Sequence, residues 1–326
     1  MNKNLREEKM IINLLILIIG FVILIKGADV FVDGASSLAK NFKLSSMFIG
    51  LTIVSFGTSA PEFAVSIQSI LKGSGDIVLG NVIGSNILNI LLILGTSALV
   101  HSLSVKNNTV KKELPITILM SVLLIVLMND SLLGHGINDF SRQDGIIVCL
   151  FFCVFIYYLI YMMRNYRSKE DEQEIIKYNI PKSIIFVLIG LVGIILGSNF
   201  VVNGASKIAT ILGVSERMIA LTIVALGTSL PELVTSVIAT RKGEYDIAIG
   251  NVVGSNIFNI GIVLGIPVAL FGGISNLTFS VIDLSVMLIS AILLFVFSYA
   301  DRKINKKEGI IMLAIFVVYY SYVIFV

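Results

Sequence analysis

The sequence predicts an all-α polytopic membrane protein with ten transmembrane helices in two inverted five-helix repeats. Three observations support this class. Of the 326 residues, 56% are hydrophobic and only 14% are charged, whereas about a quarter of the residues in soluble proteins are charged. The hydrophobic residues form runs long enough to cross a membrane. The first half of the chain also matches the second half residue by residue.

Ten apolar segments are candidates for membrane spans, because a helix needs about 20 residues to cross the hydrocarbon core. Basic residues precede the first segment, but no small-residue cleavage site follows it, so we expect a retained helix rather than a signal peptide. The predicted spans cover residues 11–38, 47–71, 76–100, 113–129, 145–163, 183–210, 218–240, 246–271, 279–299 and 309–326.

An internal repeat divides the chain. Residues 27–95 match residues 197–265 without a gap at a constant offset of 170, and about half of the positions are identical. We therefore expect a first repeat over 1–163, a polar cytoplasmic connector over 164–182 and a second repeat over 183–326. Five spans are an odd number, so the second repeat enters the membrane from the opposite side. Inverted repeats are typical of secondary transporters, whose substrate site lies where the halves meet.

The basic residues predict the orientation. With the N-terminus outside, sixteen Lys and Arg fall on the inner side and seven on the outer side. Cytoplasmic loops carry an excess of these residues. We therefore expect a multi-pass protein of the cytoplasmic (inner or plasma) membrane, with both termini extracytoplasmic.

A polar insert interrupts the second predicted span and recurs in the seventh, as Gly57-Thr58-Ser59-Ala60-Pro61-Glu62 and Gly227-Thr228-Ser229-Leu230-Pro231-Glu232. Proline has no N–H, so the carbonyls of Gly57 and Gly227, four residues earlier, lose their helical partners. Broken backbone at this depth is tolerated where it is buried in protein or lines a cavity. Glu62 and Glu232 fall near the middle of their spans, where an ionisable residue indicates a functional site.

The next span of each repeat adds a polar stripe, because residues four apart share one face of a helix. The ion-binding motifs are therefore predicted at residues 55–62, 80–89, 225–232 and 250–259. An all-oxygen donor set with two carboxylates suits a hard cation, and Ca²⁺ better than Mg²⁺ or Zn²⁺. The stripes consist of Asn81, Ser85 and Asn89 in the first repeat and Asn251, Ser255 and Asn259 in the second.

Each element also has a structural interpretation. A Ser or Thr within a span often bonds its own helix, and a single intramembrane Glu can serve as a hydrogen-bond partner. Two complete copies in register favour a site instead. An enzyme is not expected, because the spans contain no His, and His101 and His135 lie in predicted loops. Cys149 and Cys153 provide neither a disulfide framework nor a metal site.

The inserts, together with Gly80-Asn81-x-x-Gly84-Ser85-Asn86-x-x-Asn89 and its second copy, resemble the two α-repeats of the cation/Ca²⁺ exchanger superfamily. The match is most similar to the prokaryotic sodium/calcium exchangers and covers essentially the whole chain. The resemblance implies antiport of Na⁺ for Ca²⁺ by alternating access. Both ions are then transported substrates, no cofactor or nucleic acid takes part, and a monomer suffices.

The resemblance also implies roles for individual residues. Glu62 and Glu232 are the central ligands shared by Ca²⁺ and Na⁺. Asn89 and Asn259 line the centre. The flanking groups are the backbone carbonyls of Thr58, Thr228, Ser55 and Ala225 and the hydroxyls of Ser59, Ser85, Ser229 and Ser255.

One position departs from the family pattern. Several prokaryotic and potassium-dependent members carry Asp where this chain has Asn259. This argues against potassium dependence and removes one candidate proton-binding group. The Gly-Asn-Ala-x-Glu motif typical of the Ca²⁺/H⁺ branch is also absent from the sequence. The alternatives that stay open are a Ca²⁺/H⁺ antiporter and, less favoured, a cation channel.

Overall fold

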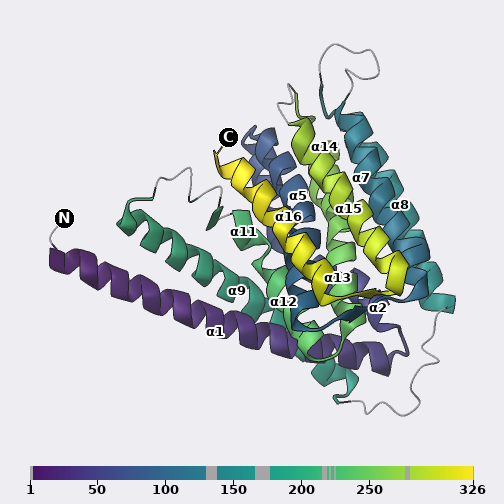
Figure 1. Ribbon diagram of the computed structural model, residues 1–326, viewed down its shortest axis with the longest axis horizontal. Coiled ribbons are helices and arrows are strands. Elements are labelled where there is room, and N and C mark those ends of the chain that lie inside the picture. The colour runs from purple at the N-terminus through teal and green to yellow at the C-terminus, as the bar shows by residue number, and fades with distance from the viewer. Residues whose placement is uncertain are drawn as a thin grey trace.

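Two long helices, α1 (Lys3–Asn41) and α9 (Ile180–Leu212), lie side by side and extend away from the remaining helices (Figure 1). The computed structural model describes residues 3–129, 138–165, 177–214, 219, 222–223, 225–275 and 280–325. The connector predicted at 164–182 lies largely outside the described residues. The loop that contains His135 lies outside them too.

Seven helical segments are long and apolar enough to cross a membrane, and one bent pair passes the same test as a unit. The seven are Glu8–Asn41, Gly75–Val100, Arg142–Asn165, Ile180–Leu212, Tyr245–Phe271, Val281–Asp301 and Lys306–Phe325. The bent pair joins Ser46–Thr58 to Ala60–Leu71 at an angle of 46°. The chain is thus a mostly helical, polytopic membrane protein.

Two of the ten predicted spans do not meet this test. For the span predicted at 113–129, helix α7 (Leu114–Met128) has only 15 residues and follows a π-helical turn, η3 (Thr109–Glu113). For the span predicted at 218–240, several of the first residues lie outside the described part of the chain. Its described remainder forms α11 (Ala225–Thr228) and α12 (Leu230–Arg241).

The centre of the bundle consists of two composite helices. One comprises α5 (Gly75–Leu88), the π-helical turn η2 (Asn89–Leu94) and α6 (Gly95–Val100). The other comprises α13 (Tyr245–Phe258), the turn η6 (Asn259–Leu264) and α14 (Gly265–Phe271). Their apolar stretches are 72% and 83% buried, compared with 11% for α16 (Lys306–Phe325). Polar residues on the central helices are therefore kept from lipid.

The bent pair is built from short pieces: α2 (Ser46–Ile49), the π-helical turn η1 (Gly50–Val54), α3 (Ser55–Thr58) and α4 (Ala60–Leu71). The outer helices of the bundle are α7, α8 (Arg142–Asn165), α15 (Val281–Asp301) and α16. Glu113, the last residue of η3, accepts a hydrogen bond from the Tyr158 hydroxyl. Asp283 of α15 accepts one of 2.9 Å from the Tyr319 hydroxyl. Tyrosines of α8 and α16 thus bind these two carboxylates.

Short contacts tie the loops together at both ends of the bundle. At the end nearer the connector, strands β1 (Leu103–Ser104) and β2 (Lys303–Ile304) pair antiparallel, with Leu103 opposite Ile304. Lys106 forms a 3.0 Å ion pair with Asp246 at the start of α13. At the opposite end, Phe140 and Ile274 form an isolated β-bridge. We call these the connector end and the far end.

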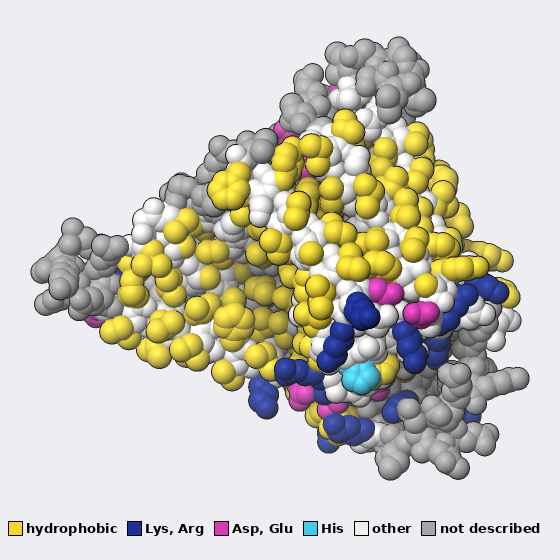
Figure 2. Space-filling model, in the orientation of Figure 1, with side chains coloured by type: hydrophobic (Ala, Val, Ile, Leu, Met, Phe, Trp, Pro, Cys, Tyr) yellow, Lys and Arg dark blue, Asp and Glu magenta, His cyan; other side chains and the backbone are white. Residues whose placement is uncertain are grey.

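The surface is mostly apolar along the helices, and dark-blue Lys and Arg side chains gather at one edge (Figure 2). Leu150, Val154, Ile189 and Val318 are among many exposed hydrophobic residues. Without contact to lipid, so large an apolar surface would favour aggregation. The arrangement is that of helices facing a bilayer.

Glycines allow α1 and α9 to approach closely, as small residues do between membrane helices. A Cβ on Gly190 would lie 2.5 Å from the backbone N of Phe31, and one on Gly197 would lie 2.4 Å from that of Leu24. A Cβ on Gly27 would lie 2.8 Å from the backbone of Gly193. The two helices therefore pack backbone against backbone as one unit.

We expect Gly190→Ala to lower the thermal unfolding midpoint, because the added methyl group forces α1 and α9 apart. Overpacking costs about 1–3 kcal/mol. At an unfolding entropy of about 2.1 cal/mol/K per residue, this corresponds to roughly 1–5 °C for a chain of 326 residues. The matched control is Ile189→Ala in α9, whose side chain is 61% exposed and lies next to Gly190 in the sequence. Equal midpoints for the two purified variants in detergent would contradict the close packing.

Candidate functional site

The two polar inserts fold into the same helix break. Ser59 separates α3 from α4 with φ −84° and ψ 5°, and Ser229 separates α11 from α12 with φ −89° and ψ 4°. Pro61 and Pro231 occupy the first turn of the helix that follows, where the missing N–H costs nothing. The repeated sequence thus produces the same backbone geometry twice.

Each break places charge where the helix termini favour it. Glu62 and Glu232 lie in the first turn of α4 and α12, and the partial positive charge of a helix N-terminus stabilises a carboxylate there. The carbonyls at the end of the preceding helix carry the opposite partial charge and lie toward the break. Each break therefore places a carboxylate beside the carbonyl end of the preceding short helix. In the first break, the Ser55 carbonyl still accepts a 3.0 Å hydrogen bond from the Ser59 N–H.

The two carboxylates are almost completely buried, at 1% exposure each. Both oxygens of Glu62 and Oε2 of Glu232 have no hydrogen-bond partner among the described residues. Buried polar atoms are normally paired, and leaving a charged one unpaired is expensive. These three oxygens are therefore free to bind a positively charged ligand.

Hydroxyl groups connect the two halves around these carboxylates. Ser59 Oγ donates to Glu232 Oε1 over 3.0 Å and lies 3.0 Å from Ser255 Oγ. At the equivalent place, Ser229 Oγ lies 3.4 Å from Ser85 Oγ. Each serine of a break thus contacts the central helix of the other repeat, and all four hydroxyls are buried.

Asparagines hold the breaks in place. Asn81 Nδ2 donates to the backbone O of Glu62 over 3.2 Å, and Asn251 Nδ2 donates to that of Glu232 over 3.4 Å. The Thr58 hydroxyl also donates to Asn251 Oδ1 over 3.0 Å. The first residue of each predicted stripe therefore fixes the backbone of the glutamate rather than pointing an oxygen at a ligand.

A symmetrical network of four asparagines joins the central helices. Asn89 Nδ2 donates to Asn256 Oδ1 over 3.0 Å, and Asn259 Nδ2 donates to Asn86 Oδ1 over 3.0 Å. The Nδ2 groups of Asn86 and Asn256 each donate to the other's backbone O, over 3.3 and 3.4 Å. Asn89 and Asn259 thus use their side-chain N–H groups in this network. Their Oδ1 atoms are buried and have no hydrogen-bond partner among the described residues.

The π-helical turns set the direction of these side chains. Asn89 is the first residue of η2 and Asn259 the first of η6. A π-helical turn changes the angular position of the residues that follow it, and such turns are frequent at functional sites. The sequence contains no simple signal for them, since residues four apart are expected to continue one stripe.

The remaining predicted residues are arranged less uniformly. Thr58 is buried and its hydroxyl lies within 3.3 Å of the carbonyls of Val54 and Ser55. Thr228 ends α11 and is partly buried, while the side chain of Ala225 lies outside the described residues. The carbonyl of Gly227, expected to lose its helical partner, accepts a 3.0 Å hydrogen bond from Ser198 Oγ of α9.

Sequence reasoning assigned no role to Asn86 and Asn256. Both are buried, and both orient a neighbouring asparagine across the repeat interface. Their identity at the offset of 170 was the available signal. The contacts between them could not be deduced, because they join residues 167 to 173 positions apart.

The assembled donor set consists of oxygen atoms. It combines two carboxylates with serine hydroxyls and asparagine carbonyls, and among the described residues no group of three His, Cys, Asp or Glu could hold a metal ion. Hard cations such as Ca²⁺ prefer oxygen ligands of this kind. The buried acceptors without partners are consistent with a cation as ligand.

Comparisons with known proteins agree with this chemistry. The family model described as sodium/calcium exchanger protein matches residues 12–161 and 182–325. A putative antiporter, CaxA, of Alkalimonas amylolytica is 37% identical, over 97% of this chain and 99% of the relative. The sodium/calcium exchanger MaX1 of Methanosarcina acetivorans is 30% identical, over 94% and 97%. A structure of the sodium-calcium exchanger NCX_Mj, soaked with zero Na⁺ and Ca²⁺, superposes with a TM-score of 0.82 at 32% identity, over 96% and 99%.

The asparagine network makes a stability prediction. Asn256→Ala leaves the Asn89 amide without its acceptor and removes a donor to Asn86. Leaving buried polar groups unpaired costs about 1–3 kcal/mol, so we expect a lower thermal unfolding midpoint in ion-free buffer. The matched control is Asn165→Ala, an exposed asparagine with one local 3.0 Å bond to the Tyr161 carbonyl. A midpoint as high as the control's would show that the network adds no stability.

Proposed function

Because this chain belongs to the sodium/calcium exchanger family, we propose that it is a secondary antiporter that exchanges Na⁺ for Ca²⁺ across the cytoplasmic membrane by alternating access. The observation that most strongly supports this proposal is the pair of buried carboxylates. Three of their oxygens have no hydrogen-bond partner among the described residues. Intramembrane carboxylates mark ion pathways, because a charge in the membrane is costly unless it is compensated. Cation/Ca²⁺ exchange is the activity of the family; Na⁺ as the coupling ion is our proposal.

The proposed ligands follow the donor set. Glu62 and Glu232 bind Ca²⁺ or Na⁺ at the centre, and the Oδ1 atoms of Asn89 and Asn259 complete the central site. The four serine hydroxyls and the backbone carbonyls at the two breaks supply flanking Na⁺ sites. These residues are Ser59, Ser85, Ser229, Ser255, Ser55, Thr58, Ala225 and Thr228.

The charge of the site explains why binding of the two ions is exclusive. With Asn at positions 89 and 259, only Glu62 and Glu232 contribute negative charge to the described donor set. Two carboxylates neutralise one Ca²⁺ but not Ca²⁺ and several Na⁺ together. Charges a few ångströms apart in a medium of low polarity repel one another strongly. Each ion therefore displaces the other, which is the condition for exchange.

The topology we propose has ten spans, in inverted repeats over 1–163 and 183–326, with the ion site at their interface. Both termini are extracytoplasmic, and the connector and the connector end face the cytoplasm. The gathering of basic side chains at one edge of the surface supports this orientation. One chain supplies the whole donor set, so a monomer suffices for transport and no cofactor is required.

A Ca²⁺/H⁺ antiporter is the alternative, since the same carboxylates are able to take up protons. Asn259 argues against it, because an asparagine binds no proton in exchange for an ion. A channel needs no inverted halves or exclusive occupancy, and so the paired helix breaks favour an exchanger. We expect no enzymatic activity, because the predicted spans contain no His.

We expect Glu62→Gln and Glu232→Gln each to reduce Na⁺-gradient-driven uptake of radiolabelled Ca²⁺ into proteoliposomes at least tenfold, because each removes half of the negative charge of the site. The control is Glu113→Gln. Glu113 is a fully buried carboxylate outside the site, and the amide oxygen of the glutamine can still accept the hydrogen bond from the Tyr158 hydroxyl. This variant should keep most of the activity. Wild-type uptake in either site variant would refute the proposed ligands.

The coupling ion is identified by separate gradients. Proteoliposomes loaded with Na⁺ at equal pH should accumulate Ca²⁺, whereas a pH gradient without Na⁺ should drive less than about a tenth of that uptake. Both experiments use the wild-type protein with the membrane potential clamped. Uptake driven by the pH gradient alone would identify H⁺ rather than Na⁺ as the coupling ion. Ca²⁺ flux without either gradient would indicate a channel.

A further inference from the structure

Acidic residues of α1 bind the turn between α12 and α13 at the connector end. Asp29, Asp33 and Ser36 lie four and three residues apart and so share one face of α1. Lys242 Nζ lies 2.9 Å from Asp29 Oδ1 and 2.7 Å from Asp33 Oδ1, and it donates to the backbone O of Asp29 over 2.7 Å. Ser36 Oγ donates to Glu244 Oε1. Two successive turns of α1 are thus held by one lysine.

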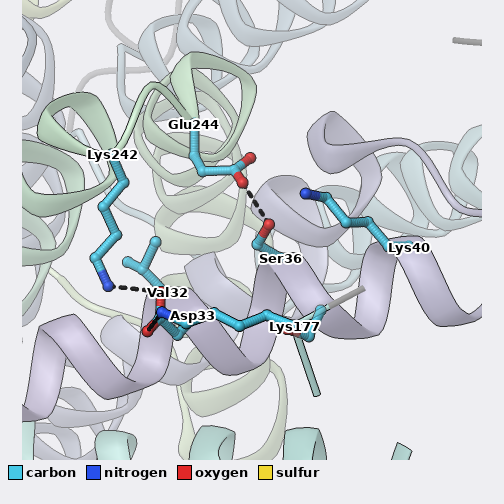
Figure 3. A pocket seen from close by; sticks show the side chains of 8 residues that line it. Val32, Asp33, Ser36, Lys40, Lys177, Lys242 and Glu244 are labelled. Carbon is cyan, nitrogen blue, oxygen red and sulfur yellow. Dashed lines mark hydrogen bonds and ion pairs between the residues drawn. The ribbon is translucent and has the colours of Figure 1, made fainter. Parts of the chain in front are cut away.

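Asp33 has a second partner that remains within the α1–α9 unit. Lys177, three residues before α9, donates to Asp33 Oδ2 over 2.6 Å, and this bond raises the pKa of the lysine. Asn41 Nδ2 at the end of α1 likewise donates to the carbonyl of Tyr178 over 2.8 Å. Figure 3 shows Lys177 and Lys242 converging on Asp33 from different elements, around a cavity of about 430 Å³. Among the described residues, Lys242 is the ion-pair partner that connects Asp33 to the rest of the bundle.

The first repeat has an equivalent turn between α4 and α5, but α9 of the second repeat lacks the acidic residues that would bind it. At the offset of 170, Lys72 corresponds to Lys242, and Asn199 and Asn203 take the places of Asp29 and Asp33. The turns are alike, with Gly73 at φ 72° and Gly243 at φ 78°. Lys72, Asn199 and Asn203 are all exposed, and within the described part of the chain no ion pair joins them. Within the described part of the chain, the ionic contact is therefore present at the connector end and not at the equivalent turn.

The helices of the bundle also pack closely at the connector end. A Cβ on Gly50 would lie 3.0 Å from the Gly250 Cα, so η1 and α13 approach backbone to backbone there. Together with the ion pairs, this packing closes the connector end in this conformation.

We propose that Asp29, Asp33 and Lys242 form an ionic latch that holds the α1–α9 unit against the α12–α13 turn and stabilises the conformation closed at the connector end. The inference rests on the proposed alternating access, in which this end must open. Lys242 and Asp33 are 23% and 17% exposed, so the contact is less screened than a surface ion pair. The latch makes two similar repeats unequal and biases the carrier toward one state.

The test measures opening at the connector end directly. Ser37 of α1 lines the cavity and is 2% exposed. In a Cys149→Ser/Cys153→Ser background, Ser37→Cys reports opening through its rate of reaction with a membrane-impermeant maleimide, in nanodiscs without an ion gradient. We expect Asp29→Asn/Asp33→Asn to raise this rate about three- to tenfold, because lost latch energy increases the open population. The substitution installs the residues that α9 carries at the equivalent positions, and so it is compatible with a folded helix.

Lys242→Gln should raise the rate similarly. Lys177→Gln is the matched control, because it removes an ion pair to the same carboxylate without releasing the α12–α13 turn, and it should leave the rate within twofold. Lys72→Gln tests the opposite turn and should also have no effect. Unchanged labelling in Asp29→Asn/Asp33→Asn, or an equal increase in Lys177→Gln, overturns the latch. Because labelling requires no transport, failure of Na⁺-driven Ca²⁺ uptake in the wild type counts against the proposed function instead.

Discussion

The central constraint on this structure is the burial of two carboxylates within a membrane bundle. Glu62 and Glu232 are 1% exposed, and three of their four oxygens lack a hydrogen-bond partner among the described residues. Such charges cost several kcal/mol unless something compensates them. Helix N-termini and a few hydroxyls compensate in part, which leaves a site whose most favourable occupant is a cation. Transport chemistry follows from this incomplete compensation.

The surrounding fold supports the carboxylates through broken helices. Each break creates a helix N-terminus for a glutamate, and an asparagine from the next helix binds the backbone of that glutamate. The breaks are tolerated because they pack against the most buried helices of the bundle. Glycines let these backbones approach, and the asparagine network fixes how the two repeats meet.

Symmetry at the centre contrasts with asymmetry at the ends. The central network is nearly twofold, as expected when both states of a carrier must bind the same ions. At the connector end, however, Asp29 and Asp33 bind Lys242, whereas their counterparts in the second repeat are neutral. In the alternating access proposed above, identical halves would give the inward-open and outward-open states the same energy. Partly buried ion pairs at one end make these energies unequal.

The membrane class and the internal repeat can be predicted from the amino-acid sequence, because long hydrophobic runs and a repeated polar insert have strong local signatures. The same pattern predicts which serines accompany Glu62 and Glu232. The folded chain is needed to see that Ser59 reaches Glu232 in the other repeat, that Asn86 and Asn256 orient the central amides, and that Lys242 pairs with α1. These contacts join residues far apart in the chain, and no local periodicity determines which side chains meet when two halves pack.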